Sequence, residues 1–319
     1  MRKGQLVVCR TAWSVVLLVL CLFPLSAFAS PFIYLTNSAE GTVSVIDMET
    51  DRVVDPSITV EDGPFGVALN PAGTRLYVTS LQSGTVSIID TSTNTSIGIR
   101  VRVGNEPSGI VVDRKSGKIY VANYGSDTIS VIDPATNEVS GSPITVERNP
   151  YGMALNPAGT RLYVSNQGSN TISVIDTTAN KVVESIPVGS LPQGILLAPK
   201  GNLLYVANAG GNSVLAIDTA TNKITEPQLT VGMSPTAIAI NPSGTRLYVA
   251  NYAGDDVSVI DTVSNKVIGP PMPVGHNPYA IMVNSSGDLV YVANRGSSTV
   301  SVIDVATGKV IETIPYGKK

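Results

Sequence analysis

The chain has 319 residues, of which 43% are hydrophobic and 14% are charged, and its formal net charge at pH 7 is −3. A mildly acidic chain without a basic tract is poorly suited to nucleic acid, because such binding depends on neutralising phosphates with Lys and Arg. We therefore expect no nucleic-acid partner. The length is sufficient to bury a large core in one domain or two.

The first 29 residues have the three parts of a secretory signal peptide. Two arginines and a lysine in the first ten residues make a basic start, and an apolar run follows. The sequence Ala-Phe-Ala at 27–29 then offers the small residues of a cleavage site. We assign residues 1–29 to a signal peptide cleaved after Ala29 and residues 30–319 to the mature protein.

Cleavage would remove both cysteines, Cys9 and Cys21, and all the basic residues of the leader, which leaves 18 basic against 24 acidic residues and a net charge of −6. The mature chain would then have no disulfide and no cysteine ligand for zinc. We expect it to be extracytoplasmic (periplasmic, secreted or at the cell surface), with no membrane span. A lipoprotein anchored at Cys21 is the alternative, but Leu20 stands where a small residue would precede the cysteine.

A unit of about 43 residues repeats seven times after the leader. A tyrosine recurs in contexts such as "LYVAN" and "IYVAN", in steps of 43, 43, 43, 42, 43 and 43 residues, and an aspartate follows each tyrosine by 13 residues. The tyrosines are Tyr34, Tyr77, Tyr120, Tyr163, Tyr205, Tyr248 and Tyr291. Seven copies in one register leave no room for a second domain.

Each unit is predicted to contain four short strands. In the second unit they cover residues 64–71, 75–80, 85–90 and 96–103, which are rich in Val, Ile, Tyr and Thr and are separated by Gly, Pro, Asn and Asp. Four-stranded units of this length, seven in number, predict an all-β, seven-bladed β-propeller.

The first unit departs from this pattern. Its predicted innermost strand, which begins with a proline in the other units (Pro64, Pro107, Pro150, Pro192, Pro235 and Pro278), has no counterpart after cleavage. Too few residues follow the last unit to supply the strand from the C-terminus. We expect the first blade to have three strands, or the ring to close without strand exchange between its ends.

The motifs "LYVAN", "TVSVID" and "TNKV", found in one register, resemble the YVTN-repeat β-propeller family of secreted and surface-layer proteins. The resemblance extends over residues 31–317 and implies the fold and an extracytoplasmic location, but it names no ligand. Propellers similar to this family include lactonases and streptogramin-type lyases, which act at the channel mouth. Some related propellers hold haem d1 or lie beside quinone enzymes.

Residues that recur in every unit are interpreted first as structural. We expect the seven tyrosines to pack between blades and the seven aspartates to hold turns. The asparagine of "VAN", present in all units but one, is also a turn former. Because it lies next to the loops that precede the first strand, a role in binding stays open for Asn123 and Asn251.

Residues that break the repeat are the better candidates for function. Strand alternation places the loops before the first strand and those between the second and third strands on one face, which we call the Pro-loop face. We expect a ligand- or partner-binding surface there, made of aromatic and charged side chains. Its predicted residues are Phe65, Tyr124, Tyr151, Tyr252, Tyr279, His276, Arg295, Asn123 and Asn251.

We expect a monomeric, non-catalytic protein that binds a partner protein, a glycan or a small ligand. The alternative is a hydrolase or lyase that uses a metal or the only histidine, His276, which is a weak catalytic candidate because no motif surrounds it. No cofactor is predicted, although a divalent metal at the channel mouth is an open alternative. A redox accessory protein is the least favoured hypothesis, because the chain has one histidine and no mature cysteine.

Overall fold

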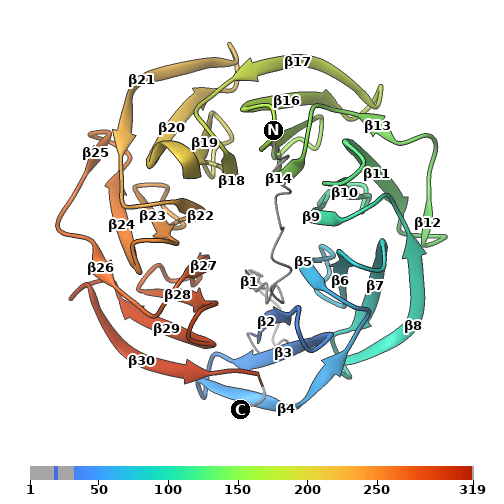
Figure 1. Ribbon diagram of the computed structural model, residues 1–319, viewed down its shortest axis with the longest axis horizontal. Helices are drawn as coiled ribbons and strands as arrows, with labels where there is room; N and C mark the ends of the chain where they lie inside the picture. The colour runs from blue at the N-terminus through green and yellow to red at the C-terminus, as the bar shows by residue number, and fades with distance from the viewer. Residues whose placement is uncertain (1–17, 21–31, 318–319) are drawn as a thin grey trace, which may run out of the picture.

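The computed structural model describes residues 18–20 and 32–317 and is an all-β ring (Figure 1). Its strands form seven sheets, which stand around a central channel as the blades of a β-propeller. The helical element in this part of the chain is a single 3₁₀ turn, Ala209–Gly211. None of the described residues form a helix that is long and apolar enough to span a membrane. The predicted seven-bladed fold is confirmed.

The strands follow one another around the ring in chain order. Blade one has β1 (Leu18–Leu20), β2 (Phe32–Asn37), β3 (Thr42–Asp47) and β4 (Arg52–Thr59). Blade two has β5 (Pro64–Leu69), β6 (Arg75–Ser80), β7 (Thr85–Asp90) and β8 (Thr95–Arg102). Blade three has β9 (Pro107–Val112), β10 (Ile119–Asn123), β11 (Thr128–Asp133), β12 (Glu138–Val139) and β13 (Ile144–Thr145). Blade four has β14 (Pro150–Leu155), β15 (Arg161–Asn166), β16 (Thr171–Asp176) and β17 (Lys181–Pro187). Blade five has β18 (Pro192–Leu197), β19 (Leu203–Asn208), β20 (Ser213–Asp218) and β21 (Lys223–Thr230). Blade six has β22 (Pro235–Ile240), β23 (Arg246–Asn251), β24 (Asp256–Asp261), β25 (Lys266–Val267) and β26 (Met272–Pro273). Blade seven has β27 (Pro278–Val283), β28 (Leu289–Asn294), β29 (Thr299–Asp304) and β30 (Lys309–Pro315).

Within each blade the strands pair antiparallel in sequence order, so every blade is one continuous piece of chain. In blades two to seven the innermost strand begins at the loop proline and lies nearest the channel (Figure 1). In blades three and six the outermost strand is divided into two short pieces. The interruptions contain Pro143 in blade three and Pro270 with Pro271 in blade six. Proline has no N–H for the ladder, so pairing stops there.

The core consists of apolar layers between neighbouring blades. One layer joins Tyr77 and Ile88 of blade two to Ile119 and Val121 of blade three, and the other junctions repeat this arrangement. All seven repeat tyrosines are between 0 and 4% exposed. The Tyr34 hydroxyl donates a hydrogen bond to Asn94 Oδ1 of the next blade at 3.0 Å. The prediction that these tyrosines pack between blades is confirmed.

The repeat aspartates hold the turn that follows the third strand, as predicted. Asp218 Oδ1 accepts hydrogen bonds from the backbone N–H groups of Ala220 at 3.0 Å and Thr221 at 2.8 Å. The bonds from Thr221 are the main cause of the lowered pKa of the Asp218 carboxyl. The carboxylate therefore serves as the fixed acceptor of a tight turn.

Blade one differs from the others, as the sequence predicts. Residues 32–59 supply three strands, β2 to β4. The short β1 lies in the segment assigned to the signal peptide and pairs antiparallel with β2, with Leu18 opposite Leu35. The predicted cleavage site lies outside the described residues. Blades one and seven exchange no strand, because β30 completes blade seven and β2 to β4 belong to blade one.

Side chains join the ring where blades seven and one meet. The Tyr291 hydroxyl is hydrogen-bonded to the side chain of Asp51, a residue of blade one. Tyr316 is 6% exposed, packs in the same apolar layer as Ile33 and Leu35, and donates a hydrogen bond to the Asn294 carbonyl at 3.4 Å. The junction is therefore closed by packing and hydroxyl contacts.

Asp51 is an unfavourable residue at this junction. It occupies the turn position held by Asn94 in blade two, with φ of 51°, and Asn is more tolerant of this conformation. Burial is the main cause of its raised pKa, and Glu312 and Asp47 also raise it. The folded protein therefore keeps a proton that the unfolded chain releases, and stability falls as pH rises through that interval.

We expect Asp51→Asn to stabilise the protein at pH 7, because it removes the charge and retains an acceptor for Tyr291. The gain should shrink below about pH 4, where an unfolded-state Asp is itself protonated. Thermal unfolding of both proteins from pH 3 to pH 8 measures this effect. Asn94→Asp is the matched variant and should destabilise blade two at pH 7. A gain that is the same at pH 3 and pH 7 would assign the effect to the backbone conformation alone.

Candidate functional site

The start of each innermost strand positions the residue after the loop proline. Pro150 lies opposite Asn166, and the register then shifts before Met153 pairs with Val164. The same shift follows Pro64 in β5 and Pro278 in β27. An irregularity of this kind re-aims side chains relative to a regular strand. In blades two, four and seven the re-aimed residue is aromatic: Phe65, Tyr151 and Tyr279.

These three rings meet although their blades are spread around the ring. The Phe65 centroid lies 5.6 Å from that of Tyr151 and 6.2 Å from that of Tyr279, both edge to face. The hydroxyls of Tyr151 and Tyr279 are hydrogen-bonded to each other. Because β5, β14 and β27 line different sides of the channel (Figure 1), the three side chains reach across it.

Two more tyrosines and an arginine extend this group. The Tyr124 ring is 6.4 Å from Tyr151, the Tyr252 ring is 6.0 Å from Tyr279, and the guanidinium carbon of Arg295 lies 5.8 Å from the Tyr279 centroid. Arginine over an aromatic ring is a cation–π contact. We call these six residues the channel cluster: Phe65, Tyr124, Tyr151, Tyr252, Tyr279 and Arg295. The structure thus brings together six of the nine residues predicted for the binding surface.

The loops that carry Tyr124 and Tyr252 are held in the same way. Asn149 Nδ2 donates to the Tyr124 carbonyl at 3.2 Å, and Asn277 Nδ2 donates to the Tyr252 carbonyl at 3.1 Å. The backbone N–H of Asn277 also donates to Asp255 Oδ1 at 2.7 Å. The two halves of the cluster are therefore built by the same local structure in blades three and six.

The innermost strands of blades three and six carry small polar residues at the aromatic position, and that of blade five carries Gln193. Ser108 Oγ donates to the Pro150 carbonyl at 3.0 Å, and Thr236 Oγ1 donates to the Pro278 carbonyl at 3.2 Å. Both side chains are buried and fix the strand that carries the next tyrosine. They support the cluster without belonging to its surface.

Burial keeps the central phenols neutral. Desolvation raises the pKa of Tyr151 well above its usual range, and the neighbouring Tyr279 raises it further. Desolvation also raises the pKa of Tyr279 to about 12, against opposing effects of Tyr151 and Arg295. At neutral pH both groups are therefore hydrogen-bonding hydroxyls rather than bases.

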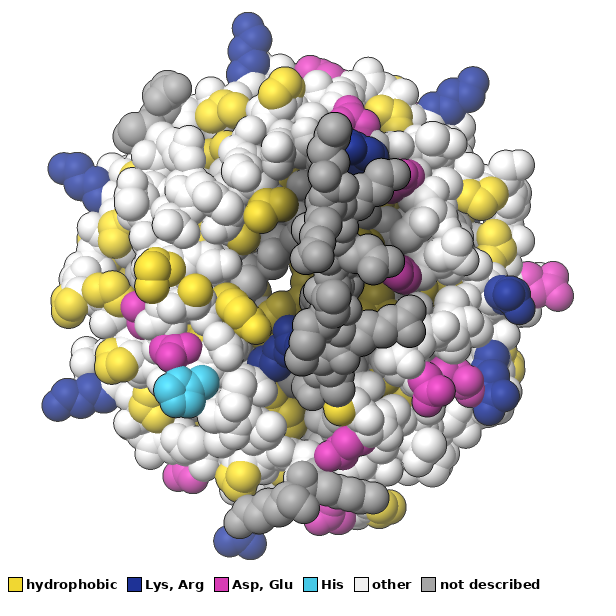
Figure 2. All heavy atoms as spheres, in the orientation of Figure 1, with side chains coloured by type: hydrophobic (Ala, Val, Ile, Leu, Met, Phe, Trp, Pro, Cys, Tyr) yellow, Lys and Arg dark blue, Asp and Glu magenta, His cyan; other side chains and the backbone are white. Residues whose placement is uncertain are grey.

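His276 lies on the same face but outside the channel cluster. Its side chain is 76% exposed, and Nδ1 lies 2.8 Å from Asp255 Oδ2. The Asn277 N–H and then His276 are the main causes of the lowered pKa of Asp255. Figure 2 shows the exposed histidine on this face, with hydrophobic side chains between the channel and the rim and basic side chains mostly at the outer edge.

Asn123 and Asn251 are fully buried. Asn123 Nδ2 donates to Thr128 Oγ1 at 3.1 Å and to Ser130 Oγ at 2.9 Å, and its Oδ1 accepts from the Gly104 N–H at 3.0 Å. Asn251 bonds the next strand of its own blade in a similar way. The contacts of both side chains are structural, so we leave them out of the candidate surface.

Gln167 is a neighbour of the cluster that was not among the predicted residues. Its Oε1 accepts a hydrogen bond from the Tyr124 hydroxyl at 3.0 Å. Gln167 follows the "VSN" asparagine, at the repeat position of Tyr124, Tyr252 and Arg295. Comparing that position across all units would have identified it. Within residues 18–20 and 32–317, no three His, Cys, Asp or Glu side chains gather as metal ligands would.

Comparisons with known proteins agree with this architecture. No curated protein matches the sequence. The structure is similar to Kuenenia stuttgartiensis hydrazine synthase, with a TM-score of 0.78 and 23% identity over 86% of this chain and 92% of that chain. It is also similar to a functionally unknown protein from Desulfotomaculum acetoxidans, with a TM-score of 0.76 and 17% identity over 88% and 94% of the two chains. At these identities the likeness concerns the fold alone. A family model matches residues 40–319, and the chain therefore belongs to the family described as a domain of unknown function (DUF5074).

Proposed function

We propose that the protein is an extracytoplasmic, non-catalytic binding protein whose Pro-loop face holds a partner protein, a glycan or a small ligand. The observation that carries the proposal is the channel cluster. Its members break the repeat, yet they come from blades two, three, four, six and seven and converge on one place. Tyr and Arg in partly buried clusters contribute a large share of the energy of many binding interfaces.

The resemblance to YVTN-repeat propellers supports the extracytoplasmic location, and the leader-like residues 1–29 agree with it. We propose that the mature protein is a monomer. A closed ring without strand exchange needs no second chain to complete a blade. The rings meet across the channel, so a ligand would lie over the cluster and contact its outward edges.

The double substitution Tyr151→Ala and Tyr279→Ala should weaken ligand or partner binding at least tenfold. The two rings hold the cluster together across the channel, so removing both takes away the surface over which a ligand would lie, and a loss of about 1.4 kcal/mol is enough for a factor of ten. Titration calorimetry with a panel of soluble glycans, small polar ligands and cell-envelope proteins measures the change.

Two control proteins make this test specific. The pair Tyr151→Phe and Tyr279→Phe keeps both rings and separates loss of the hydroxyls from loss of packing. Val263→Ala changes an 81% exposed residue in a turn after a third strand, and binding should be unaffected. A ligand that binds the alanine double variant as tightly as the wild type would contradict the proposal, and so would a panel in which nothing binds the wild type.

A second candidate function follows from the contact between His276 and Asp255. A histidine with an acidic partner is one arrangement used for acid–base catalysis. This hypothesis predicts that the purified protein hydrolyses a lactone or opens a cyclic ester, and that His276→Ala abolishes the activity. Activity that persists in His276→Ala would reject this role for the histidine.

A further inference from the structure

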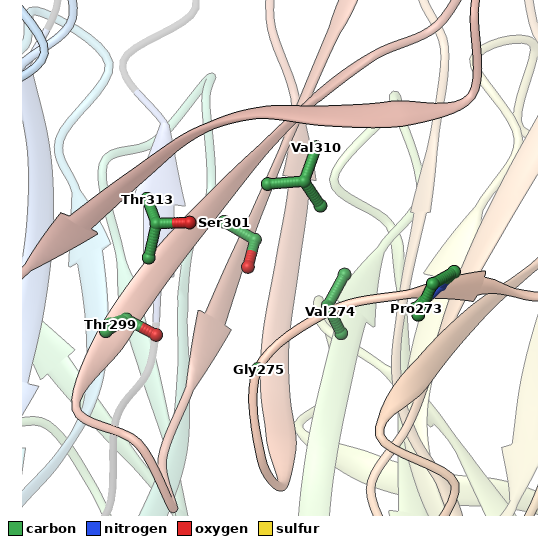
Figure 3. A pocket seen from close by; sticks show the side chains of 7 residues that line it. All are labelled: Pro273, Val274, Gly275, Thr299, Ser301, Val310 and Thr313. Carbon is green, nitrogen blue, oxygen red and sulfur yellow. The ribbon is translucent and has the colours of Figure 1, made fainter.

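A cavity of about 290 Å³ lies between blades six and seven, away from the channel cluster. One wall is the stretch 273–275, which leads from β26 into the next Pro loop. The other wall belongs to β29 and β30 (Figure 3). The lining residues are Pro273, Val274, Gly275, Thr299, Ser301, Val310 and Thr313. Three side-chain hydroxyls therefore stand beside two valines, and no lining side chain is charged.

The junction between blades three and four is the same structure 128 residues earlier in the chain. Thr171 and Ser173 of β16 correspond to Thr299 and Ser301 of β29. Ser173 lies opposite Ser185 in β17, just as Ser301 lies opposite Thr313 in β30. The stretches on the other side of the two junctions, residues 145–147 and 273–275, make the same backbone hydrogen bond. The Val146 N–H donates to the Asp127 carbonyl and the Val274 N–H donates to the Asp255 carbonyl, each at 3.0 Å.

In blade four the hydroxyls bind a carboxylate of the protein itself. Glu147 Oε2 accepts a hydrogen bond from Thr171 Oγ1 at 2.8 Å, and Glu147 Oε1 accepts one from Ser185 Oγ. The residue equivalent to Glu147 at the other junction is Gly275. Thr299 Oγ1 there lies 3.0 Å from Ser297 Oγ. The second junction thus has the hydroxyls of a carboxylate site without the glutamate.

Glycine also stands at the position of Gly275 in the stretches that face blades three, five and six (Gly104, Gly189 and Gly232). These glycine junctions do not share the arrangement of hydroxyls. Blade five has Leu215 at the position of Ser301, and blade six has Asp256 at the position of Thr299. Leucine provides no donor, and an aspartate would repel an anion. In blade three the outermost strand is divided into β12 and β13, so Ser130, at the position of Ser301, has no paired residue like Thr313.

The junction of blades seven and one has Gly317 at the position of Gly275 and Thr42 and Ser44 at the positions of Thr299 and Ser301, but β3 and β4 shift register between Val43 and Val45, so Ser44 has no residue paired with it in β4. Within residues 32–317, the junction of blades six and seven is therefore the glycine junction that repeats the pairing of the glutamate site.

We propose that this cavity binds the carboxylate of a small aliphatic acid. The Thr299 and Thr313 hydroxyls donate to its two oxygens, as Thr171 and Ser185 do for Glu147. The acid lies in the cavity beside Gly275, where Val274 and Val310 contact its short hydrocarbon chain. Hydrogen bonds to a charged acceptor are stronger than neutral ones, which allows binding without a cation in the lining. The proposal is independent of the function assigned to the channel cluster.

Sodium propionate is the probe, because it reproduces the end of a glutamate side chain. Titration of the full mature chain, followed by amide NMR at constant ionic strength, should give saturable shifts at Gly275, Thr299 and Ser301. Thr313→Val removes one donor with little change of shape and should weaken binding about tenfold. Ser185→Ala, the corresponding change at the occupied junction, should leave propionate binding unchanged.

A variant that should gain a site tests directly whether the Glu147 site is a valid model for the proposed one. Glu147→Gly should open a second site, so that propionate also shifts the amides of Thr171 and Ser173. Gly275→Glu is a poorer choice, because a Cβ at that position would lie 2.5 Å from Ser297 Oγ. The proposal is wrong if sodium chloride produces the same shifts as propionate, if Thr313→Val binds propionate as well as the wild type does, or if folded Glu147→Gly gains no second site.

Discussion

Replacing Tyr163 with alanine is expected to lower the free energy of unfolding by about 3–5 kcal/mol, the usual cost of removing a buried aromatic side chain. Tyr163 is 2% exposed and lies in the apolar layer between blades four and five, with Leu204 and Leu215 among its neighbours. The cavity would remain open, because strands on both sides fix the layer. Urea unfolding followed by circular dichroism measures the loss.

Tyr163→Phe is the matched control, since it keeps the ring, removes only the hydroxyl and should cost no more than about 1.5 kcal/mol. The alanine variant should still bind any ligand of the channel cluster at temperatures where it is folded. A loss below about 1 kcal/mol for Tyr163→Ala would show that the repeat tyrosines are not the main packing elements between blades.

Gly109→Ala should destabilise the protein by about 1–3 kcal/mol or more, because the added methyl group would clash with the backbone of the neighbouring innermost strand. A Cβ on Gly109 would lie 2.2 Å from the carbonyl oxygen of Tyr151. That oxygen belongs to the backbone of β14, so relief requires a shift of the neighbouring blade. The same shift would move the Tyr151 ring within the channel cluster. Thermal unfolding measures the stability, and tyrosine ring NMR signals report the displacement.

The equivalent position in blade six is naturally alanine, which provides the control. Ala237→Gly should cost only about 0.5–1 kcal/mol, the ordinary penalty for glycine within a strand. If Gly109→Ala is as mild as Ala237→Gly, the innermost strands can separate freely and the close approach of β9 and β14 has no structural importance.

The fold could be predicted because it depends on residues that recur. The steps between tyrosines such as Tyr120 and Tyr163 reveal the unit, and alternation of Val and Ile with small polar residues reveals the strands. The missing proline strand of the first unit also predicted the three-stranded part of blade one. The division of the outer strands of blades three and six was not predicted. Pro270 and Pro271 indicate the interruption in blade six.

The candidate surface was predicted less completely. That Tyr124, Tyr151, Tyr252 and Tyr279 share a face follows from their repeat positions. That Tyr151 and Tyr279 touch across the channel does not, because the contact depends on the channel width and on the irregular start of each innermost strand. Asn123 illustrates the opposite error: its repeat position is near the face, but its side chain turns back to bond Thr128 and Ser130.

The continuity of each blade along the chain has a practical consequence for engineering. Gly317 lies beside blade one, and a Cβ on it would be 3.7 Å from Glu40 Oε1. Phe32 begins β2 at the end of the strand away from Glu40, so a linker that runs the length of β2, about 20 Å, from residue 317 to residue 32 would permit circular permutation, with new ends cut in any loop between blades. Each permutant would keep every strand pair of β2 to β30 intact. The order in which the blades are synthesised can thus be changed, and a set of permutants would reveal which junction between blades has to form first.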